Sequence, residues 1–389
     1  MKIDKSNPLH WIWLALFSIN TCLALFLRSF IPAEKRNTAI LYGHKLSGNL
    51  KGIHDYTRQQ SHPLANNLYY LTMDPAYYRE LNKQGVKGIL CGLNPLHMLK
   101  VARAFAIISD HGLHSLIILL KISNIRFIDV WHGIPFKGFD QHDFALQHQY
   151  DEIWVGSSFL RQLYIEKFGF DEKQVKVTGY ARSDLLLNPS TEIEHIKTSL
   201  GIEKNKQVIL FAPTWQQDSH KRSIYPFGLS EQDFLEQLDR LCQKNRAVLL
   251  FRKHLNNSSD HLPEYSSIID ASFQHYPDTE AVLLASDCLI CDWSSIAFDY
   301  LLLDRPTIFL DVAPPFKKGF SLGPEFRFGA IATDMPQMLK QLQGALEQAG
   351  HYRDQHQEKH NSIRHLLYEN MANGSAAKNC LERLEKLHK

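Results

Sequence analysis

The sequence has little of what marks small secreted, disordered or nucleic-acid-binding chains. Its six cysteines are scattered through 389 residues, whereas disulfide frameworks are dense, so we expect reduced thiols in a cytosolic protein. Only 20 Gly and 16 Pro accompany a 44% hydrophobic composition, which excludes a disordered or collagen-like chain. The formal charge of +2 is far from the strong basic field that binds phosphate backbones, which argues against DNA and RNA as partners.

Several nucleotide-binding motifs are also missing. The chain has no P-loop and no G-x-G-x-x-G after its first predicted strand. It also lacks Asp-x-Asp, the metal-nucleotide signature of a major class of transferases. We therefore expect neither a metal nor another cofactor.

The length and the distribution of charge indicate more than one kind of segment. At roughly 150 residues per domain, the length predicts about 2.6 domains, which means two domains or two with an appendage. The first 50 residues carry a net charge of +4, which leaves −2 on the rest of the chain.

The appendage is predicted at residues 1–36. Residues 11–27 read WIWLALFSINTCLALFL, without a charge, and Arg28 opens a basic flank. As a helix this stretch reaches about 25 Å, the lower limit for crossing a hydrocarbon core of about 30 Å. We expect it to attach the protein to the cytoplasmic face of the cell membrane, either as a single span or as a helix lying in the interface. A buried core helix is the alternative.

After Pro32, short apolar runs alternate with helical stretches, which predicts two α/β domains. The first series has predicted strands at 38–42, 68–72, 88–91, 125–131 and 152–156, with helices around 95–109, 112–121 and 157–168. The second has strands at 207–212, 247–251, 267–270, 287–291 and 307–310, with helices near 230–244, 278–285 and 294–303. We expect domains at 37–190 and 200–345, and C-terminal helices at 346–389.

Open α/β sheets bind ligands at the carboxyl ends of their strands, so functional residues are expected directly after strands. The predicted strand 125–131 runs into WHGIPFKGFD, where His132 lies on a turn shaped by Gly133 and Pro135. An imidazole in this position suits a general base, although a structural histidine is the alternative. Lys137 is near enough in sequence to meet a phosphate.

The segment KVTGYARSDLLL, residues 176–187, delivers two more charged side chains into a turn. Arg182 could clamp a phosphate with two hydrogen bonds, and Asp184 could orient it. A plain helix N-cap is an equally good interpretation of Asp184.

In the second domain, Ser294 and Ser295 are predicted at a helix N-terminus after a strand. Hydroxyls, free backbone N–H groups and the positive end of the helix dipole together make an anion site, and a phosphate would fit there. Ordinary N-capping is the commoner role of such serines. Cys288 and Cys291 form a C-x-x-C inside an apolar strand, where core packing is expected rather than a metal or redox site.

Five segments in this order resemble the CDP-glycerol glycerophosphotransferase family, the teichoic-acid primases and polymerases. WHGIPFKGFD is similar to its HGTP-and-Lys segment, FAPTW to its APTW, and RKHLN to its R-x-H-P-N. GYARSDLL looks like its G-x-P-R-N-D-x-L, with Ala181 and Ser183 replacing Pro and Asn. SDCLICDWSSIAFDYLLLDRPTIFL resembles its D-x-L-I-T-D-Y-S-S segment, with Cys291, Trp293 and Arg305 replacing Thr, Tyr and Lys. The match covers about residues 125–311.

The resemblance implies a glycosyltransferase-B fold of two facing Rossmann-like domains, the first for the acceptor and the second for the donor. It implies transfer of glycerol phosphate from CDP-glycerol to a hydroxyl of a lipid-linked or glycan acceptor at the membrane, with release of CMP, in teichoic-acid-like or capsule synthesis. His132 would be the base, and His254 would meet the donor diphosphate or the leaving CMP. Ser294 and Ser295 would hold the diphosphate. Further donor-site candidates are Thr214, Asp292 and Arg182.

Three other functions remain open at this stage. A sugar transferase of the same fold would use a nucleotide sugar, and a close variant would use CDP-ribitol. An inactive, membrane-anchored binding protein is a candidate of a different class. The sequence does not distinguish a primase from a polymerase.

Overall fold

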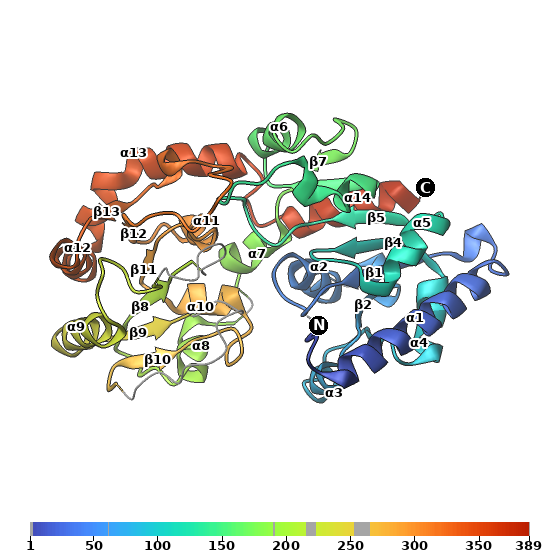
Figure 1. The fold of residues 1–389 in the computed structure, drawn as a ribbon, viewed down its shortest axis with the longest axis horizontal. Coiled ribbons are helices and arrows are strands. Elements are labelled where there is room, and N and C mark those ends of the chain that lie inside the picture. The colour runs from blue at the N-terminus through green and yellow to red at the C-terminus, as the bar shows by residue number, and fades with distance from the viewer. Residues whose placement is uncertain (1–2, 61, 190, 215–222, 253–264, 389) are drawn as a thin grey trace. The chain divides into compact units, whose positions relative to one another are not determined.

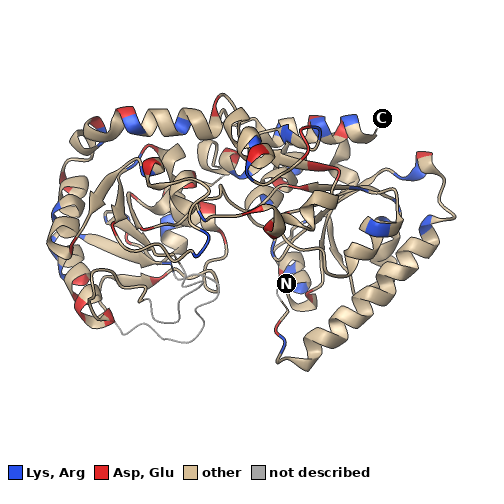
Figure 2. Cartoon of the chain, turned by 45° about the horizontal axis from the view of Figure 1, so that its top comes forward, with Lys and Arg blue, Asp and Glu red and all other residues tan. Residues whose placement is uncertain are grey.

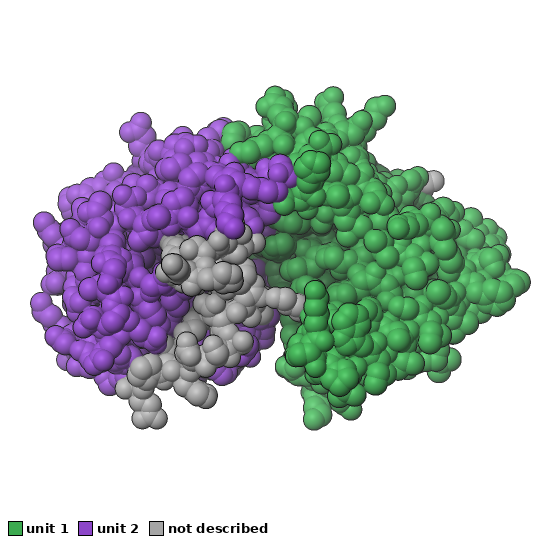
Figure 3. Space-filling view, viewed as in Figure 1, with its two compact units in different colours: residues 1–132, 141–184, 371–389 green, residues 133–140, 185–370 purple. Residues whose placement is uncertain are grey.

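The computed structural model describes residues 3–60, 62–189, 191–214, 223–252 and 265–388 (Figure 1). The chain divides into two compact units, coloured separately in Figure 3. Unit 1 comprises Met1–His132, Gln141–Asp184 and Met371–Lys389, and unit 2 comprises Gly133–Asp140 and Leu185–Asn370.

Unit 1 is built on a seven-stranded parallel sheet in the order β3-β2-β1-β4-β5-β6-β7. The inner strands are buried on both faces, so they read as continuous apolar runs such as AILY and AFAIIS. The strands are β1 (Thr38–Tyr42), β2 (Leu68–Thr72), β3 (Ile89–Cys91), β4 (Ala104–Ser109), β5 (Arg126–Asp129), β6 (Glu152–Val155) and β7 (Val175–Val177). Its helices are α1 (Pro8–Arg28), α2 (Gly48–Gln59), α3 (Pro75–Lys83), α4 (Pro95–Ala102), α5 (Ile117–Ile122), α6 (Ser158–Glu166) and α14 (Ala376–His388), and α7 (Ala181–Leu187) leads from unit 1 into unit 2.

Unit 2 repeats this architecture with six parallel strands in the order β10-β9-β8-β11-β12-β13. The strands are β8 (Gln207–Ala212), β9 (Ala247–Phe251), β10 (Ile268–Asp270), β11 (Cys288–Cys291), β12 (Thr307–Leu310) and β13 (Ala330–Ala332). The helices are α8 (Ile193–Ser199), α9 (Glu231–Lys244), α10 (Thr279–Ala285), α11 (Ile296–Tyr300), α12 (Met335–Glu347) and α13 (Ala349–Tyr368). In both sheets the strand order reverses beside the first strand, between β1 and β4 and between β8 and β11, which is where such folds bind ligands.

Most predicted strands are confirmed, and β7 is the strand expected to end at Gly179, but β4 and β13 were not foreseen. Residues 95–109 were predicted as one helix, whereas α4 ends at Ala102 and β4 begins two residues later. The signal was the composition of Ala104–Ser109, a short apolar run with Phe and two Ile before Asp110 and Gly112, which favours a buried strand over a helical turn.

The division into units differs from the predicted domains at three places. Residues 133–140 belong to unit 2 although the chain on both sides belongs to unit 1. The C-terminal helices do not form one segment, because α13 belongs to unit 2 and α14 to unit 1. Residues 1–36 are not a separate appendage, since α1 packs along unit 1 against α4 and α5.

Helix α1 has one buried and one exposed face. On the buried face, Asn20 Nδ2 donates to the Gly92 carbonyl at 2.9 Å, and the Arg28 guanidinium donates to the carbonyls of Ala102 and Ala104. Arg28 is therefore part of the packed interior and not of a basic flank in contact with solvent. The exposed face is apolar, and Figure 2 shows hardly any charge along α1. Its large exposed hydrophobic residues are Leu9, Trp11, Ile12, Leu16, Ile19, Leu23 and Phe26.

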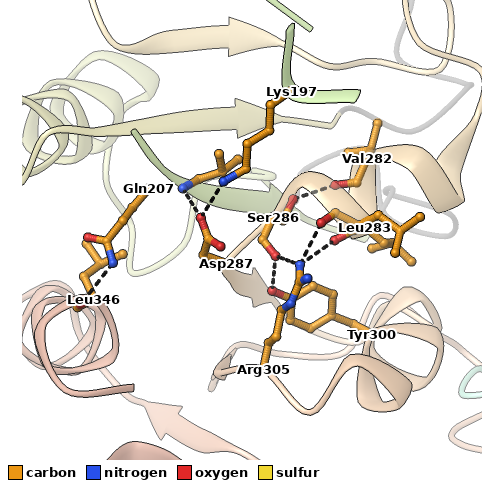
Figure 4. Close-up of polar contacts among 11 residues, drawn as sticks. Lys197, Gln207, Val282, Leu283, Ser286, Asp287, Tyr300, Arg305 and Leu346 are labelled. Carbon is orange, nitrogen blue, oxygen red and sulfur yellow. Dashed lines mark hydrogen bonds and ion pairs between the residues drawn. The ribbon is translucent and has the colours of Figure 1, made fainter. Parts of the chain in front are cut away.

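A polar cluster ties the amino end of β11 in unit 2 to its neighbours (Figure 4). The Asp287 carboxylate accepts from the Val208 N–H at 2.8 Å and from Lys197 Nζ at 3.4 Å. Arg305 Nη1 donates to the Leu284 carbonyl at 2.8 Å and to the Ser286 carbonyl, which satisfies acceptors at the C-terminus of α10.

We expect Arg305→Ala to lower the free energy of unfolding by about 2 kcal/mol, because it leaves these carbonyls without their donor. The midpoint of urea unfolding measures the loss. Arg305→Lys keeps the charge but not the fork of donors, so an intermediate midpoint is expected. An unchanged midpoint for Arg305→Ala would show that the carbonyls do not depend on the guanidinium.

Candidate active site

Three neighbouring strands of unit 1 are each followed closely by a histidine. His44 follows β1, His111 follows β4, and His132 follows β5. Because β1 pairs with β4 and β4 pairs with β5, all in parallel, the three side chains emerge at the same edge of the sheet. The structure therefore groups the predicted base with two histidines that the sequence did not single out.

The rings of these residues are in contact, and those of His111 and His132 are stacked. The ring centroids of His44 and His111 are 4.4 Å apart, and those of His111 and His132 are 4.6 Å apart with only 13° between the planes. The indole of Trp131 lies 4.5 Å from the His132 ring. Trp131 has a φ of 40°, which is rare for a bulky residue and typical of backbone held in place at functional sites.

A hydrogen bond fixes the tautomer of His132. Its Nδ1 lies 3.1 Å from the backbone carbonyl of Asp110. A carbonyl can only accept, so Nδ1 carries the hydrogen and Nε2 keeps the lone pair in the neutral ring. The residue is exposed to solvent, which leaves the lone pair within reach of a substrate.

The surroundings of His132 keep it neutral. Its pKa is lowered from that of a free histidine, first by the loss of hydration among the surrounding residues and then by the positive charge of His111. The Asp110 carboxylate opposes this shift without cancelling it. At neutral pH the ring can therefore accept a proton, as a general base must.

Asn49, in α2, positions two segments of this site, and sequence reasoning missed it. Its Nδ2 donates to the carbonyls of Val130 and Trp131 at 2.7 and 2.9 Å, and its Oδ1 accepts from the Arg182 N–H at 3.1 Å. No local motif marks it, because its partners lie 81 to 133 residues away in sequence.

Position 43 requires a glycine because the Asp110 carboxylate lies very close to its backbone. A Cβ added at this residue would lie 2.4 Å from Asp110 Oδ1, which no side chain tolerates without displacement of the carboxylate. Asp110 Oδ1 in turn accepts from His111 Nδ1 at 2.8 Å. The bare backbone of Gly43 thus makes room for the carboxylate that holds His111.

The structure separates Arg182 and Asp184 in role. Arg182 is buried in unit 1, with its guanidinium 5.0 Å from the centroid of the Tyr180 ring, whereas the other donor-site candidates that the structure describes belong to unit 2. The Asp184 carboxylate accepts from the N–H groups of Ala376 and Ala377 at 3.0 and 2.7 Å. It caps α14 from a distant part of the chain and not the helix that follows it in sequence.

In unit 2, Thr214 and Asp292 form a pair across the point where the strand order reverses. They follow β8 and β11, which are neighbours in the sheet. Asp292 Oδ1 accepts from the Thr214 N–H at 2.7 Å and also from the Thr214 hydroxyl. The carboxylate is buried, so it holds the two loops together at the carboxyl edge.

Ser294 and Ser295 precede α11 as predicted. Ser295 occupies the N-cap position, but its hydroxyl makes no capping hydrogen bond. A Cβ added at Gly133 would lie 3.1 Å from Ser295 Oγ, so the Gly133 backbone passes close to this hydroxyl. Plain N-capping therefore does not account for Ser295, whereas an anion-binding role stays a prediction.

Residues 133–140 are bound to unit 2 by their own backbone. The Gly138 N–H donates to the Gly319 carbonyl at 2.7 Å, and the Ser321 N–H donates to the Phe136 carbonyl at 3.0 Å. Phe136 packs against Trp293 with ring centroids 5.6 Å apart. Lys137 lies in this segment, with its Nζ 5.4 Å from the Phe139 ring.

Two predictions remain without a structural outcome. His254 lies outside the described residues. Among the residues that the structure describes, no three His, Cys, Asp or Glu side chains are arranged to hold a metal ion, and the requirement for metal stays a matter for experiment. Cys288 and Cys291 are buried, as expected for core residues.

Two Rossmann-like units, each with polar and titratable groups at the carboxyl edge of its sheet, define a protein of the glycosyltransferase-B type. More specifically, the chain belongs to the CDP-Glycerol:Poly(glycerophosphate) glycerophosphotransferase family, whose model matches residues 24–386.

Curated relatives and solved structures agree with this assignment. The teichoic acid ribitol-phosphate polymerase TarL of Staphylococcus aureus is 34% identical over 202 residues, which are 47% of this chain and 34% of TarL. The teichoic acid glycerol-phosphate primase of Bacillus subtilis is 25% identical over 310 residues, 74% of this chain and 77% of the primase. The structure of the wall teichoic acid polymerase TagF aligns with 96% of this chain and with 94% of the TagF chain, at a TM-score of 0.75 and 23% sequence identity. This likeness shows the fold. TagF soaked with CDPG gives a TM-score of 0.72 at 22% identity over 96% of this chain and 94% of its own.

The chain is short beside the polymerases. It spans between 34% and 42% of the length of four of the ribitol-phosphate and glycerol-phosphate polymerases that it matches.

The role assigned to Asp184 predicts a loss of stability without a loss of chemistry. Asp184→Ala should lower the free energy of unfolding by about 1–2 kcal/mol, because the first N–H groups of α14 lose their acceptor. Asp184→Asn keeps an acceptor oxygen and should lose less. Urea unfolding and transferase assays below the unfolding transition check both. A variant of normal stability that has lost activity would show that Asp184 acts in the catalytic site.

Proposed function

We propose that this protein transfers glycerol phosphate from CDP-glycerol to a hydroxyl of a membrane or lipid-linked acceptor and releases CMP, in the synthesis of a teichoic-acid-like or capsule polymer. The observation that carries the proposal is the state of His132, a neutral ring with its tautomer fixed and its Nε2 lone pair available. Membership of the family and the complex of TagF with CDPG support CDP-glycerol as the donor.

In the proposed reaction His132 acts as the base. The acceptor hydroxyl gives its proton to Nε2 while its oxygen attacks the phosphorus that bears glycerol. The bond from that phosphorus to the bridging oxygen breaks, and the oxygen leaves with CMP. We propose that Ser294, Ser295 and His254 bind the diphosphate. We propose that Lys137 and Arg182 stabilise the negative charge of the phosphates. Such transfers depend on positioning and electrostatic stabilisation more than on covalent work by the protein.

His132→Ala should slow the release of CMP from CDP-glycerol by about 10²–10⁴-fold, the usual contribution of one general base. The variant loses the hydrogen bond to the Asp110 carbonyl, so its urea midpoint should fall slightly while the protein stays folded under the assay conditions. The steady-state rate of CMP release and the binding of CDP-glycerol are measured together, and binding should survive. Unchanged activity would favour the inactive binding protein.

Two polyol nucleotides are candidates for the donor, and a screen of donor nucleotides distinguishes them. TarL is a ribitol-phosphate polymerase by name and is 34% identical to this chain, so CDP-ribitol is the second candidate. The protein is incubated with CDP-glycerol, CDP-ribitol and a nucleotide sugar, with nucleotide release as the readout. Turnover of the sugar donor alone would overturn the proposal.

Since the sequence lacks Asp-x-Asp, we also propose that the reaction proceeds in the presence of a chelator.

We further propose that α1 lies on the membrane surface and does not span it. Among the described residues it is the one helix long and apolar enough to cross a membrane. Its buried face is occupied, however, by the hydrogen bonds that Asn20 and Arg28 make to unit 1. A helix held lengthwise in this way can offer only its other face, and that face is apolar.

Substitutions on the exposed face test this attachment better than deletion of residues 1–31, which would also remove the packed face. Ile19→Gln with Phe26→Gln should lower the partition of the protein onto anionic phospholipid vesicles by at least about tenfold, since each side chain contributes about 1.5–3 kcal/mol when buried. Ile331→Gln changes an exposed apolar residue of β13 and is the matched control. Equal sedimentation of all three proteins with vesicles would refute the surface assignment.

A further inference from the structure

We propose that His111, held by Asp110, is a positioning residue that keeps His132 neutral and in place as the base. The residue assigned to catalysis is thus one member of a pair of stacked imidazoles. The catalytic role of this pair rests on the proposed function, whereas the electrostatic coupling between the two rings does not.

The first support is the geometry of the stack. The His111 ring contacts two others, with its centroid 4.6 Å from that of His132 and 4.4 Å from that of His44. The 13° angle between the planes of His111 and His132 gives broad face contact. Together with the bond from His132 Nδ1 to the Asp110 carbonyl, this contact leaves the His132 ring a single orientation.

The second support is the hydrogen bond that orients His111. Its Nδ1 donates to Asp110 Oδ1 at 2.8 Å, and that carboxylate is buried against the backbone of Gly43. Burial lowers the pKa of His111, but the charge of Asp110 and this hydrogen bond outweigh it, so the pKa is raised overall. His111 therefore keeps its proton at pH values where a free histidine begins to lose it.

A protonated His111 disfavours a second proton on His132. Two unit charges at 4.6 Å in a partly exposed site repel strongly enough to lower the pKa of His132 by at least about one pH unit. The same loop thus supplies both the carbonyl that fixes the tautomer of His132 and the cation that keeps its ring neutral.

The other charged and titratable groups around His132 do not reverse this balance. Asp110 raises the pKa of His132. Arg182, from α7, lowers the pKa of His132. Burial raises the pKa of Asp129, at the end of β5, to about 8, and the charge of this carboxyl, where it is ionised, adds to that of Asp110 in raising the pKa of His111. The pKa of His132 is lowered overall, so the loss of hydration and the neighbouring cations prevail.

The sign of the expected effect follows from these charges. The base form of His132 is the active form, and the cation of His111 extends that form to lower pH. Removal of the cation raises the pKa of His132, so the acidic limb of the pH profile of kcat/KM moves to higher pH. Activity falls most at acidic pH and least at alkaline pH.

The test uses the full-length protein with ¹³C-labelled histidine. The signal of His132 is identified by its loss in His132→Gln, and its titration midpoint is measured by NMR without substrate. His111→Phe keeps a stacked ring without the charge, and the midpoint should rise by about one pH unit. His111→Lys restores a cation without the ring, and the midpoint should stay near that of the parent. His44→Phe changes a ring that lies against His111 and leaves the His111 cation in place, so it should shift the midpoint less.

Activity assays then separate this proposal from the proposed function. In His111→Phe the acidic limb of CMP release should move upward by the same amount as the NMR midpoint. If the midpoint moves while no donor is turned over by the parent, the coupling stands and the proposed function fails. If the midpoint does not move in either His111→Phe or the second neutral variant His111→Gln, the proposal is overturned.

Discussion

The parallel pairing of β1 with β4 and of β4 with β5 is the constraint on which the unit 1 site depends. Neighbouring strands in a sheet are about 4.8 Å apart, and their carboxyl ends share one edge. The histidines that follow these strands are therefore brought together at ring spacings of 4.4 and 4.6 Å, close to the spacing of the strands themselves. The sheet fixes the interval, and Asp110, Gly43 and Asn49 fix the orientation.

The same constraint acts in unit 2 with different residues. There β8 and β11 are the neighbours at which the strand order reverses, and the buried Asp292 joins the loops that follow them through Thr214. The serines come directly afterwards, before α11. One architecture thus presents a titratable ring in one unit and small hydroxyls in the other, which suits the division between proton transfer and phosphate recognition in the proposed reaction.

The sequence was informative wherever function follows directly from a strand end. His132, Thr214, Asp292 and the two serines could be singled out because each stands just beyond an apolar run. His111 stands in a similar position after β4, but the sequence pattern predicts one helix over 95–109, which hides the strand end that His111 follows. The signal was present in the composition of Ala104–Ser109.

Other features depend on contacts that no local pattern reports. Asp184 meets the N-terminus of α14 across nearly two hundred residues, and Asn49 reaches the backbone of Val130 and Trp131. The sequence did predict an apolar N-terminal helix. It could not show that Asn20 and Arg28 turn one face of that helix into packed interior, because their partners are backbone carbonyls of distant segments.

A base of lowered pKa suits the chemistry proposed here. Phosphoryl transfer passes through a loose transition state in which the bond to the leaving group is largely broken, so the attacking hydroxyl needs little activation. A weak base that is always in its neutral form then serves better than a strong one that is partly protonated. The cation of His111 also favours the release of the proton that His132 gains, which returns the base to its starting state for the next transfer.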